Sequence, residues 1–161
     1  MKKTTSFLLL ALTVFLLVSC SKKVVFDEKV VFPNANWAFE NKAVNFNAHL
    51  TGSDQPYAVI LELDLFGTPN VDKFYADFII LSPNGGRTVK SIIFNFKNPQ
   101  EPFIQGASEN EKIYRLVVYP KRYFTETGEY KFVVNQFSNK ADNYGIRALR
   151  MYIERVKEER E

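Results

Sequence analysis

The chain has 161 residues, of which 46% are hydrophobic and 15% aromatic, and a formal net charge of +3 at pH 7. It contains a single cysteine and a single histidine, which excludes a disulfide within the chain, a thiolate metal site and a histidine-rich metal site. The small net charge excludes the strong field by which nucleic-acid-binding domains attract their partners. We therefore expect no metal, no cofactor and no nucleic-acid partner.

Residues 1–19 have the three-part layout of a secretory signal peptide. Lys2 and Lys3 give a positive start, residues 7–18 form an uncharged and mostly apolar run, and Ser19 is a small residue at its end. The apolar run is about 12 residues long, whereas a helix that spans the ~30 Å hydrocarbon core of a membrane needs roughly 20. We therefore expect this segment to be cleaved rather than to stay as an anchor.

The end of this segment predicts a lipid anchor. Leu17-Val18-Ser19-Cys20 resembles a bacterial lipobox, which implies cleavage after Ser19 and attachment of acyl chains such as palmitate at Cys20. A signal anchor, or a secretory signal with an incidental cysteine, is the alternative. Because the only cysteine falls where lipid chemistry needs it, we expect residues 20–23 to be a lipidated cysteine and a short tether. The 142 residues that remain of 161 carry 19 of the 21 basic side chains and all 18 acidic ones.

The rest of the chain is typical of β-structure, because apolar residues recur at every second position and turn residues separate the apolar segments. In residues 44–50, apolar and polar side chains alternate strictly, which predicts a strand with one buried face. Pro83, Asn84 and Gly85 favour a tight turn between two segments. The predicted strands are 24–32, 44–50, 57–66, 74–81, 88–96, 113–119 and 130–137.

The last segment, residues 146–156, fits two kinds of element. Its apolar residues at spacings of three, four and three match one face of a helix. Leu149, Met151 and Ile153 equally match the alternation of a strand. Periodicity alone leaves both open.

These elements predict an all-β antiparallel sandwich, jelly-roll-like, with about seven to eight strands in one domain over residues 24–156. We expect the predicted strand 113–119 to stop at Pro120. We also expect residues 98–111 to form a polar loop and residues 157–161 to form a charged tail. The side chains expected between the two sheets are Phe46, Leu61, Leu63, Phe78, Ile80, Phe94, Val117, Phe132 and Val134.

Residues that carry chemistry are few. His49 falls on the polar side of a predicted strand without a G-x-S-x-G motif, so we expect it to face solvent. Glu62 and Asp64 alternate on one strand, about 7 Å apart at a rise of ~3.4 Å per residue. That separation suits a glycosidase pair, but such residues more often mark a solvated face. Oxygen atoms near Asn70 and Asp72 offer a Ca²⁺ site without EF-hand spacing. We therefore expect that the protein has no catalytic residue and is not an enzyme.

Three aromatic residues are weak candidates for a partner-binding surface. Trp37 precedes a predicted strand, where an exposed ring would anchor a glycan or a protein and a buried ring would close the end of the sandwich. Tyr119 and Tyr123 flank the basic residues 121–122. This stretch is able to stack on a sugar or contact a lipid headgroup, or to form a polar loop whose rings rest on the domain edge.

Three motifs together resemble one family. They are P-x-x-x-W at 33–37, the alternating residues 44–50 with 57–61, and TGEYKFVVNQ at 127–136 followed by Gly-Ile at 145–146. On these motifs, the chain resembles the gliding-motility lipoproteins of the GldH family of Bacteroidetes over roughly residues 24–156. It departs from the family pattern at residues 65–70 and 99–112, as a divergent relative would.

The resemblance implies a lipid-anchored envelope protein that serves gliding motility or the associated protein-secretion assembly through contact with other envelope proteins. It also implies a closing strand, which favours a strand over residues 146–156. No catalytic residue is carried over from the family. Surface export of lipoproteins in this phylum is associated with acidic residues after the cysteine, whereas Ser21-Lys22-Lys23 follows here. We therefore expect an outer-membrane anchor with the domain facing the periplasm.

A glycan-binding lipoprotein of a polysaccharide uptake system is the alternative function. It calls for exposed, coplanar rings, such as Trp37 with Tyr119 or Tyr123, and a buried Trp37 counts against it. In the leading interpretation the partners are the membrane, through the lipid, and other envelope proteins. That interpretation includes no small-molecule ligand.

Overall fold

The computed structural model of the chain describes residues 23–97, 103–105 and 111–156. The predicted signal peptide 1–19, Cys20 with most of its tether, and the tail 157–161 lie outside the described residues. Within these described ranges, no helix is long and apolar enough to cross a membrane. The elements are β1 (Val24–Val31), η1 (Pro33–Ala35), η2 (Phe39–Asn41), β2 (Ala43–Leu50), β3 (Tyr57–Phe66), β4 (Lys73–Leu81), β5 (Arg87–Asn95), β6 (Phe103–Gln105), β7 (Glu111–Arg122), β8 (Gly128–Gln136) and β9 (Ile146–Arg155).

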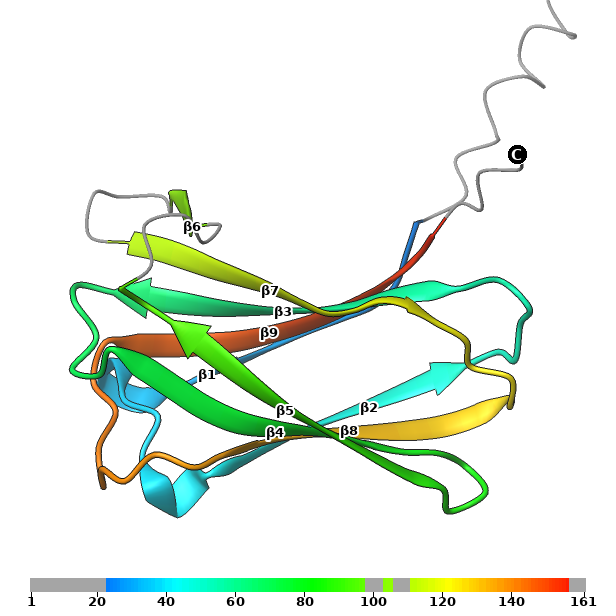
Figure 1. Ribbon diagram of the computed structural model, residues 1–161, viewed down its shortest axis with the longest axis horizontal. Coiled ribbons are helices and arrows are strands. Elements are labelled where there is room, and N and C mark those ends of the chain that lie inside the picture. Colours follow the sequence, from blue (N-terminus) through cyan, green and yellow to red (C-terminus); the bar gives the residue numbers. More distant parts are fainter. Residues whose placement is uncertain (1–22, 98–102, 106–110, 157–161) are drawn as a thin grey trace, which may run out of the picture.

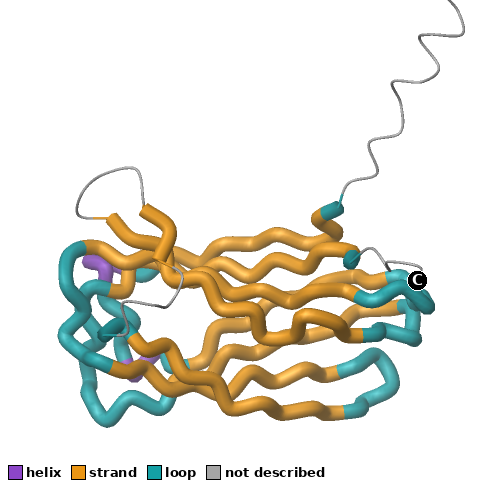
Figure 2. Tube along the Cα trace, turned by 45° about the horizontal axis from the view of Figure 1, so that its top comes forward, coloured by secondary structure: helices purple, strands orange, loops and turns teal. Residues whose placement is uncertain are grey.

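The strands form two antiparallel sheets packed face to face (Figures 1 and 2). One sheet has the order β1-β9-β3-β7-β6 and the other β2-β8-β4-β5. Apart from the short β6, this order is that of a jelly roll, in which the chain repeatedly crosses from one sheet to the other. The predicted jelly-roll-like sandwich is therefore confirmed, with eight of the described strands in its framework.

The core lies between the sheets because strict alternation turns one face of each strand inward. In β2, Val44, Phe46, Ala48 and Leu50 are buried and the residues between them are exposed. Eight of the nine predicted core residues are at most 3% exposed; they are Phe46, Leu61, Leu63, Phe78, Ile80, Phe94, Phe132 and Val134.

Val117 is the incorrect member of the predicted core. Its side chain is 45% exposed, whereas that of Val118 is 1% exposed. Ile60 of β3 lies opposite Val117, but Val59 lies opposite Tyr119, so Val118 is the extra residue of a β-bulge. Because β7 is apolar at consecutive positions here, alternation did not define which side faces inward.

The region around β7 differs from the prediction in two further ways. The strand continues through Pro120 to Arg122, past its expected end. A second register shift between β7 and β3 surrounds Pro120, and a bulge tolerates a residue that has no N–H to donate. In addition, β6 pairs with β7 where an unbroken polar loop was expected.

Residues 146–155 form a strand, as the family resemblance favoured. The register between β3 and β9 shifts at Asp64 and Leu65, which leaves Arg147 as an extra residue. The bulge brings Ile146 and Leu149 to the same inward face although they are three residues apart. The helix-like spacing of three between Ile146 and Leu149 is therefore the signature of a bulged strand.

The described chain enters and leaves the sandwich at one end, which we call the entry end (Figure 1). Val24 lies opposite Glu154, and Tyr57 lies opposite both Arg155 and Arg122. The β2–β3 and β7–β8 loops and the β4–β5 turn are at this end as well. The opposite end, which carries η1 and η2, is the far end.

Trp37 closes the far end. Its side chain is fully buried, and its ring stacks on Phe32 with centroids 4.8 Å apart. The indole Nε1 donates a hydrogen bond to the Asn41 carbonyl at 2.9 Å, and Asn143 Nδ2 donates to the Trp37 carbonyl at 2.9 Å. Of the two interpretations of Trp37, the buried plug is the correct one.

Candidate functional site

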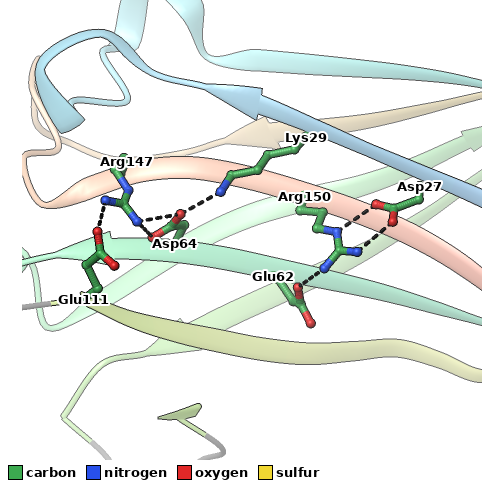
Figure 3. Close-up of polar contacts among 7 residues, drawn as sticks. All are labelled: Asp27, Lys29, Glu62, Asp64, Glu111, Arg147 and Arg150. Atoms are coloured by element: carbon green, nitrogen blue, oxygen red, sulfur yellow. Dashed lines mark hydrogen bonds and ion pairs between the residues drawn. The ribbon is translucent and has the colours of Figure 1, made fainter. Parts of the chain in front are cut away.

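A line of charged side chains crosses the outer face of the β1-β9-β3-β7 sheet (Figure 3). In its first group, Arg150 of β9 binds Asp27 of β1 through Nε at 2.7 Å and Nη2 at 2.6 Å. The Nη1 of Arg150 also donates to Glu62 of β3 at 3.0 Å. The hydrogen bonds from Arg150 hold the pKa of Asp27 below its usual value, and those to Asp27 raise the pKa of Arg150.

The second group surrounds Asp64, which is 7% exposed. Lys29 Nζ donates to its Oδ2 at 2.7 Å, and Arg147 Nη2 donates to its Oδ1 at 2.8 Å. Arg147 also donates to Glu111 through Nη1. The hydrogen bonds to Glu111 and Asp64 raise the pKa of Arg147. The β-bulge in β9 places this guanidinium between the two carboxylates.

These contacts correct the expectation of a solvated face at Glu62 and Asp64. The Glu62 side chain is only 12% exposed, and Tyr152 Oη donates to it at 3.2 Å. Burial and the Glu62 charge raise the pKa of Tyr152, which favours its protonated, donating form. Both carboxylates are committed to cations, so the arrangement serves to hold neighbouring strands together rather than to move protons.

A cleft of about 270 Å³ opens at the entry end. One wall consists of Ser82 and Gly86 of the β4–β5 turn with Arg87 and Thr88 at the start of β5. The end of β7 and the β7–β8 loop form the other, with residues 122–126, and Ile80 and Tyr130 complete the lining.

A hydrogen bond and a close backbone approach join the two walls. Asn84 Nδ2 donates to Glu126 Oε1, which joins the β4–β5 turn to the β7–β8 loop. Gly128, at φ 149°, lets the turn approach, because a Cβ there would lie 2.9 Å from Cγ of Pro83. Ser82 Oγ in turn donates to Asn84 Oδ1 at 2.6 Å. The cleft is therefore a built feature of the loops.

Polar atoms at this cleft are left without partners. Arg122 Nε and Glu126 Oε2 are both shielded from solvent and have no hydrogen-bond partner. Another nitrogen of Arg122, Nη2, donates to Thr88 Oγ1 at 3.3 Å, and this bond connects the two walls of the cleft. On the cleft lining, Tyr130 Oη donates to the Glu126 carbonyl at 3.2 Å, and burial raises the pKa of Tyr130.

The structure does not bring the three predicted aromatic residues together. Trp37 is buried at the far end, and only Tyr123, which is 49% exposed, lines the entry-end cleft. Tyr119 is half-buried, with Lys90 Nζ 4.8 Å and Arg122 Cζ 5.5 Å from its ring centroid. A coplanar platform of Trp37 with Tyr119 or Tyr123 is therefore not formed.

The other sequence candidates have ordinary surroundings. The His49 side chain is 68% exposed, as expected, with Nδ1 3.9 Å from Glu129. Asp72 pairs with Lys97 at 2.7 Å, and Asn70 Nδ2 donates to the Asp142 carbonyl at 3.2 Å. Across residues 23–97, 103–105 and 111–156, no group of three or more histidine, cysteine, aspartate or glutamate side chains is placed to hold a metal ion.

No model of a known protein family matches the chain, and no characterised protein matches it. Among solved structures, the chain is similar to a carbohydrate-binding module from the glycoside hydrolase family 9 enzyme Cel9A of Ruminococcus flavefaciens FD-1. The TM-score is 0.43 at 12% identity, over 80% of this chain and 98% of that chain. No family is therefore assigned to the chain.

Sequence reasoning missed Glu126 and Thr88 as members of a site. The signal available was the turn motif at residues 82–86 and the glycine at 128, which predicted loops but not that they meet. Their meeting depends on the pairing of β4 with β8, which residue patterns in one sequence do not reveal.

Proposed function

We propose that this chain is a non-enzymatic, lipid-anchored protein of the cell envelope, tethered through Cys20 to the periplasmic face of the outer membrane. It acts by contact with other proteins of a gliding-motility assembly or of the associated secretion assembly. The lipobox supports the anchor, and the family resemblance supports the assembly. The pairing of Glu62 and Asp64 with cations supports a role without acid–base catalysis. A lipid anchor raises the effective concentration of the domain near membrane partners.

An exposed apolar patch carries the contact proposal. It lies on the outer face of the β2-β8-β4-β5 sheet, where Tyr75 lies opposite Ile93 and Ile79 opposite Val89. Between these two apolar pairs, Ser91 Oγ donates to Asp77 Oδ1 at 2.8 Å, so one polar pair interrupts the patch. Phe137 extends it, because its N–H donates to the Tyr75 carbonyl at 2.9 Å. Tyr75, Val89, Ile93 and Phe137 are each 40–50% exposed. We call these five residues the β4–β5 patch.

The position of the patch supports a protein as its occupant. β5 is the edge strand of its sheet, so a row of backbone groups borders the apolar side chains. Exposed apolar edges are usually blunted by charges or covered, because they pair with other chains. We propose that a segment of an envelope protein pairs with β5 and covers the patch.

Crosslinking in the native membranes, followed by purification of the lipidated protein, tests this contact. Ile93→Glu places a charge on the patch, while Asn47→Glu places one on the polar outer face of β2 at the opposite edge. We expect motility or secretion proteins with the wild type and with Asn47→Glu, and their loss with Ile93→Glu. Equal recovery with Ile93→Glu would contradict the patch, and recovery of glycan transporters instead would contradict the assembly.

A second function, glycan binding by an anchored lipoprotein, is favoured by the entry-end cleft. Tyr123, Arg122 and Glu126 on its lining supply an aromatic ring and two charged side chains, which supports a polar ligand there. The burial of Trp37 counts against the ring platform that this function was expected to use.

A further inference from the structure

The free edge of β5 presents backbone groups beside the β4–β5 patch. Phe96, just after β5, donates its N–H to the Asp72 carbonyl beside β4 at 2.9 Å. Asn95 donates its N–H the other way, to Tyr114 Oη of β7 at 3.3 Å. Successive residues of a regular strand alternate in this direction, and β5 pairs with β4 without a register shift. The odd-numbered residues therefore turn their N–H and C=O groups away from β4; they are Val89, Ser91 and Ile93.

Two cations lie together beside this edge. Lys90 points toward the other sheet, where its Nζ donates to the Val118 carbonyl at 2.6 Å and lies 4.8 Å from the centroid of the Tyr119 ring. On the same ring, Cζ of Arg122 lies 5.5 Å from the centroid, and Nη2 of Arg122 donates to Thr88 Oγ1 of β5. Contacts within the domain thus hold both positive charges next to β5.

Basic residues outnumber acidic ones along this edge. β5 and residues 115–122 of β7 contain five basic residues and no acidic one. Within the part of the chain that the structure describes, no carboxylate forms an ion pair with Lys90 or Arg122. The bond to Val118 occupies one of the three donors of the Lys90 ammonium, so this group is able to bind a carboxylate as well.

Lys90 decides which strands are able to pair with β5. A lysine on the inner side of an edge strand normally prevents pairing, because the added strand would cover its charge. A carboxylate opposite Lys90 compensates that charge, whereas an apolar or basic residue there does not. The edge is therefore closed to most strands and open to a strand with an acidic inner face.

The outer side of β5 calls for the opposite chemistry. Val89 and Ile93 are 40% and 50% exposed, and apolar neighbours would cover them. Between them, Ser91 donates to Asp77, whose carboxylate would repel a second acid, so an uncharged residue fits there. The fitting segment thus alternates acidic residues on one face with apolar residues on the other, which is the pattern of a strand.

We infer that the partner segment at β5 is a strand that is acidic on its inner face and apolar on its outer face. Carboxylates lie opposite Lys90, apolar side chains opposite Val89 and Ile93, and an uncharged one opposite Ser91. This inference rests on the proposed contact at the β4–β5 patch and specifies the chemistry of that partner. The charge steers the acidic segment to the edge, and backbone bonds and apolar contacts hold it there.

Fluorescence anisotropy with a labelled peptide tests this inference on the full lipidated chain in a non-ionic detergent. The probe reads threonine–valine–glutamate–threonine–glutamate–valine–threonine, with blocked ends, and meets the stated pattern in either strand direction. The matched control has lysine in place of both glutamates and keeps the apolar residues. We expect saturable binding of the acidic peptide, about tenfold or more tighter than that of the basic peptide and weaker at high salt.

Substitutions at Lys90 locate the preference. Lys90→Gln keeps the length of the side chain and a donor for the Val118 carbonyl, and it should remove the preference for the acidic peptide. Lys90→Glu should reverse that preference. Lys131→Glu makes the same charge change on the exposed outer face of β8 and should leave the preference intact. Unchanged fluorescence of Trp37 shows that each variant has folded.

The outcomes separate this inference from the contact on which it rests. Equal affinity of the two peptides, or a preference that Lys90→Gln leaves unchanged, would overturn the inference. Binding of neither peptide would overturn it too, and crosslinking of the chain to itself at β5 would then identify a second copy as the occupant. The native crosslinking with Ile93→Glu tests whether any envelope protein contacts the patch, so the acidic strand is able to fail while the proposed contact holds.

Discussion

Arg150 binds Asp27 as a two-pronged pair, with Nε 2.7 Å from Oδ1 and Nη2 2.6 Å from Oδ2. The two residues belong to adjacent strands, β9 and β1, and the third guanidinium nitrogen reaches Glu62 on β3 (Figure 3). One side chain thus joins three strands of the sheet. This geometry fixes the orientation of the guanidinium as well as its charge.

Removal of this guanidinium should destabilise the domain. We expect Arg150→Ala to lower the free energy of unfolding by about 1–2 kcal/mol, chiefly because Glu62, only 12% exposed, loses a charged hydrogen bond. The Asp27 part is small, because that carboxylate is 43% exposed and screened by solvent. Urea unfolding measures the difference. As a matched control, Lys97→Ala breaks a pair exposed by 72% and 64% and should cost almost nothing. Equal effects of the two variants would contradict this account.

The same pair predicts a pH dependence. The pKa of Asp27 lies below the ordinary value of 3.8 in the folded state, mainly through the hydrogen bonds from Arg150. Its contribution to stability is therefore fully present above pH ~4 and is lost as the pH falls through the folded-state pKa. Comparison of unfolding free energies of the wild type and Asp27→Asn should show a difference at pH 6 that narrows below pH ~4. A difference that grows on acidification would have the wrong sign.

Trp37 should be the most sensitive single position at the far end. We expect Trp37→Ala to cost about 3–5 kcal/mol, because a fully buried indole leaves a cavity beside Phe32 and Phe74. Trp37→Phe should cost less, since it keeps most of the packing and loses the hydrogen bond to Asn41. Thermal or urea unfolding distinguishes the two. The fluorescence of this only tryptophan should resist quenching by acrylamide in the folded state, and ready quenching would contradict its burial.

The proposed anchor and the fold together predict an orientation at the membrane. Cys20 precedes Lys23 by three residues, a reach of about 10 Å, whereas the ten residues of β3 separate the two ends of the sandwich by roughly 30 Å. The entry end, with Thr125, should therefore lie nearer the bilayer than the far end, with Tyr144.

Single-cysteine labelling measures this orientation, because a lipidated Cys20 leaves no other thiol in the mature chain. A fluorophore at Thr125→Cys should be quenched by nitroxide lipids more strongly than one at the exposed Tyr144→Cys. Equal quenching at the two positions would mean that the tether does not set the orientation.

How far the sequence predicts this fold depends on how clearly each strand alternates. β2 carries asparagine or histidine between its apolar residues, so its inward face, including Phe46, follows directly from the pattern. β7 has valine at two consecutive positions, one on each face. The pattern therefore predicted Val117 as the buried residue, whereas the bulge turns Val118 inward. A β-bulge interrupts the alternation of side chains between the two faces of a strand, and no residue pattern in this sequence predicts where one occurs.

The candidate site was less predictable than the fold. The aromatic pattern singled out Trp37, Tyr119 and Tyr123, yet the three rings pack in different places because Trp37 and Tyr119 have neighbours that only tertiary structure supplies. The charges of Glu62 and Asp64 were visible in the sequence. Their partners were not, since Arg147 and Arg150 lie 83 and 88 positions away from the carboxylates that they bind.

The lipid at Cys20 is the claim on which the location, the orientation and the proposed contacts all depend. Intact-mass analysis of the protein purified from its native membranes tests it most directly, with Cys20→Ser as the control. We predict a chain that begins at Cys20 and carries acyl chains, and a Cys20→Ser variant that lacks them and leaves the membrane fraction. A wild-type chain that begins elsewhere, or that begins at Cys20 without added lipid mass, would contradict the account.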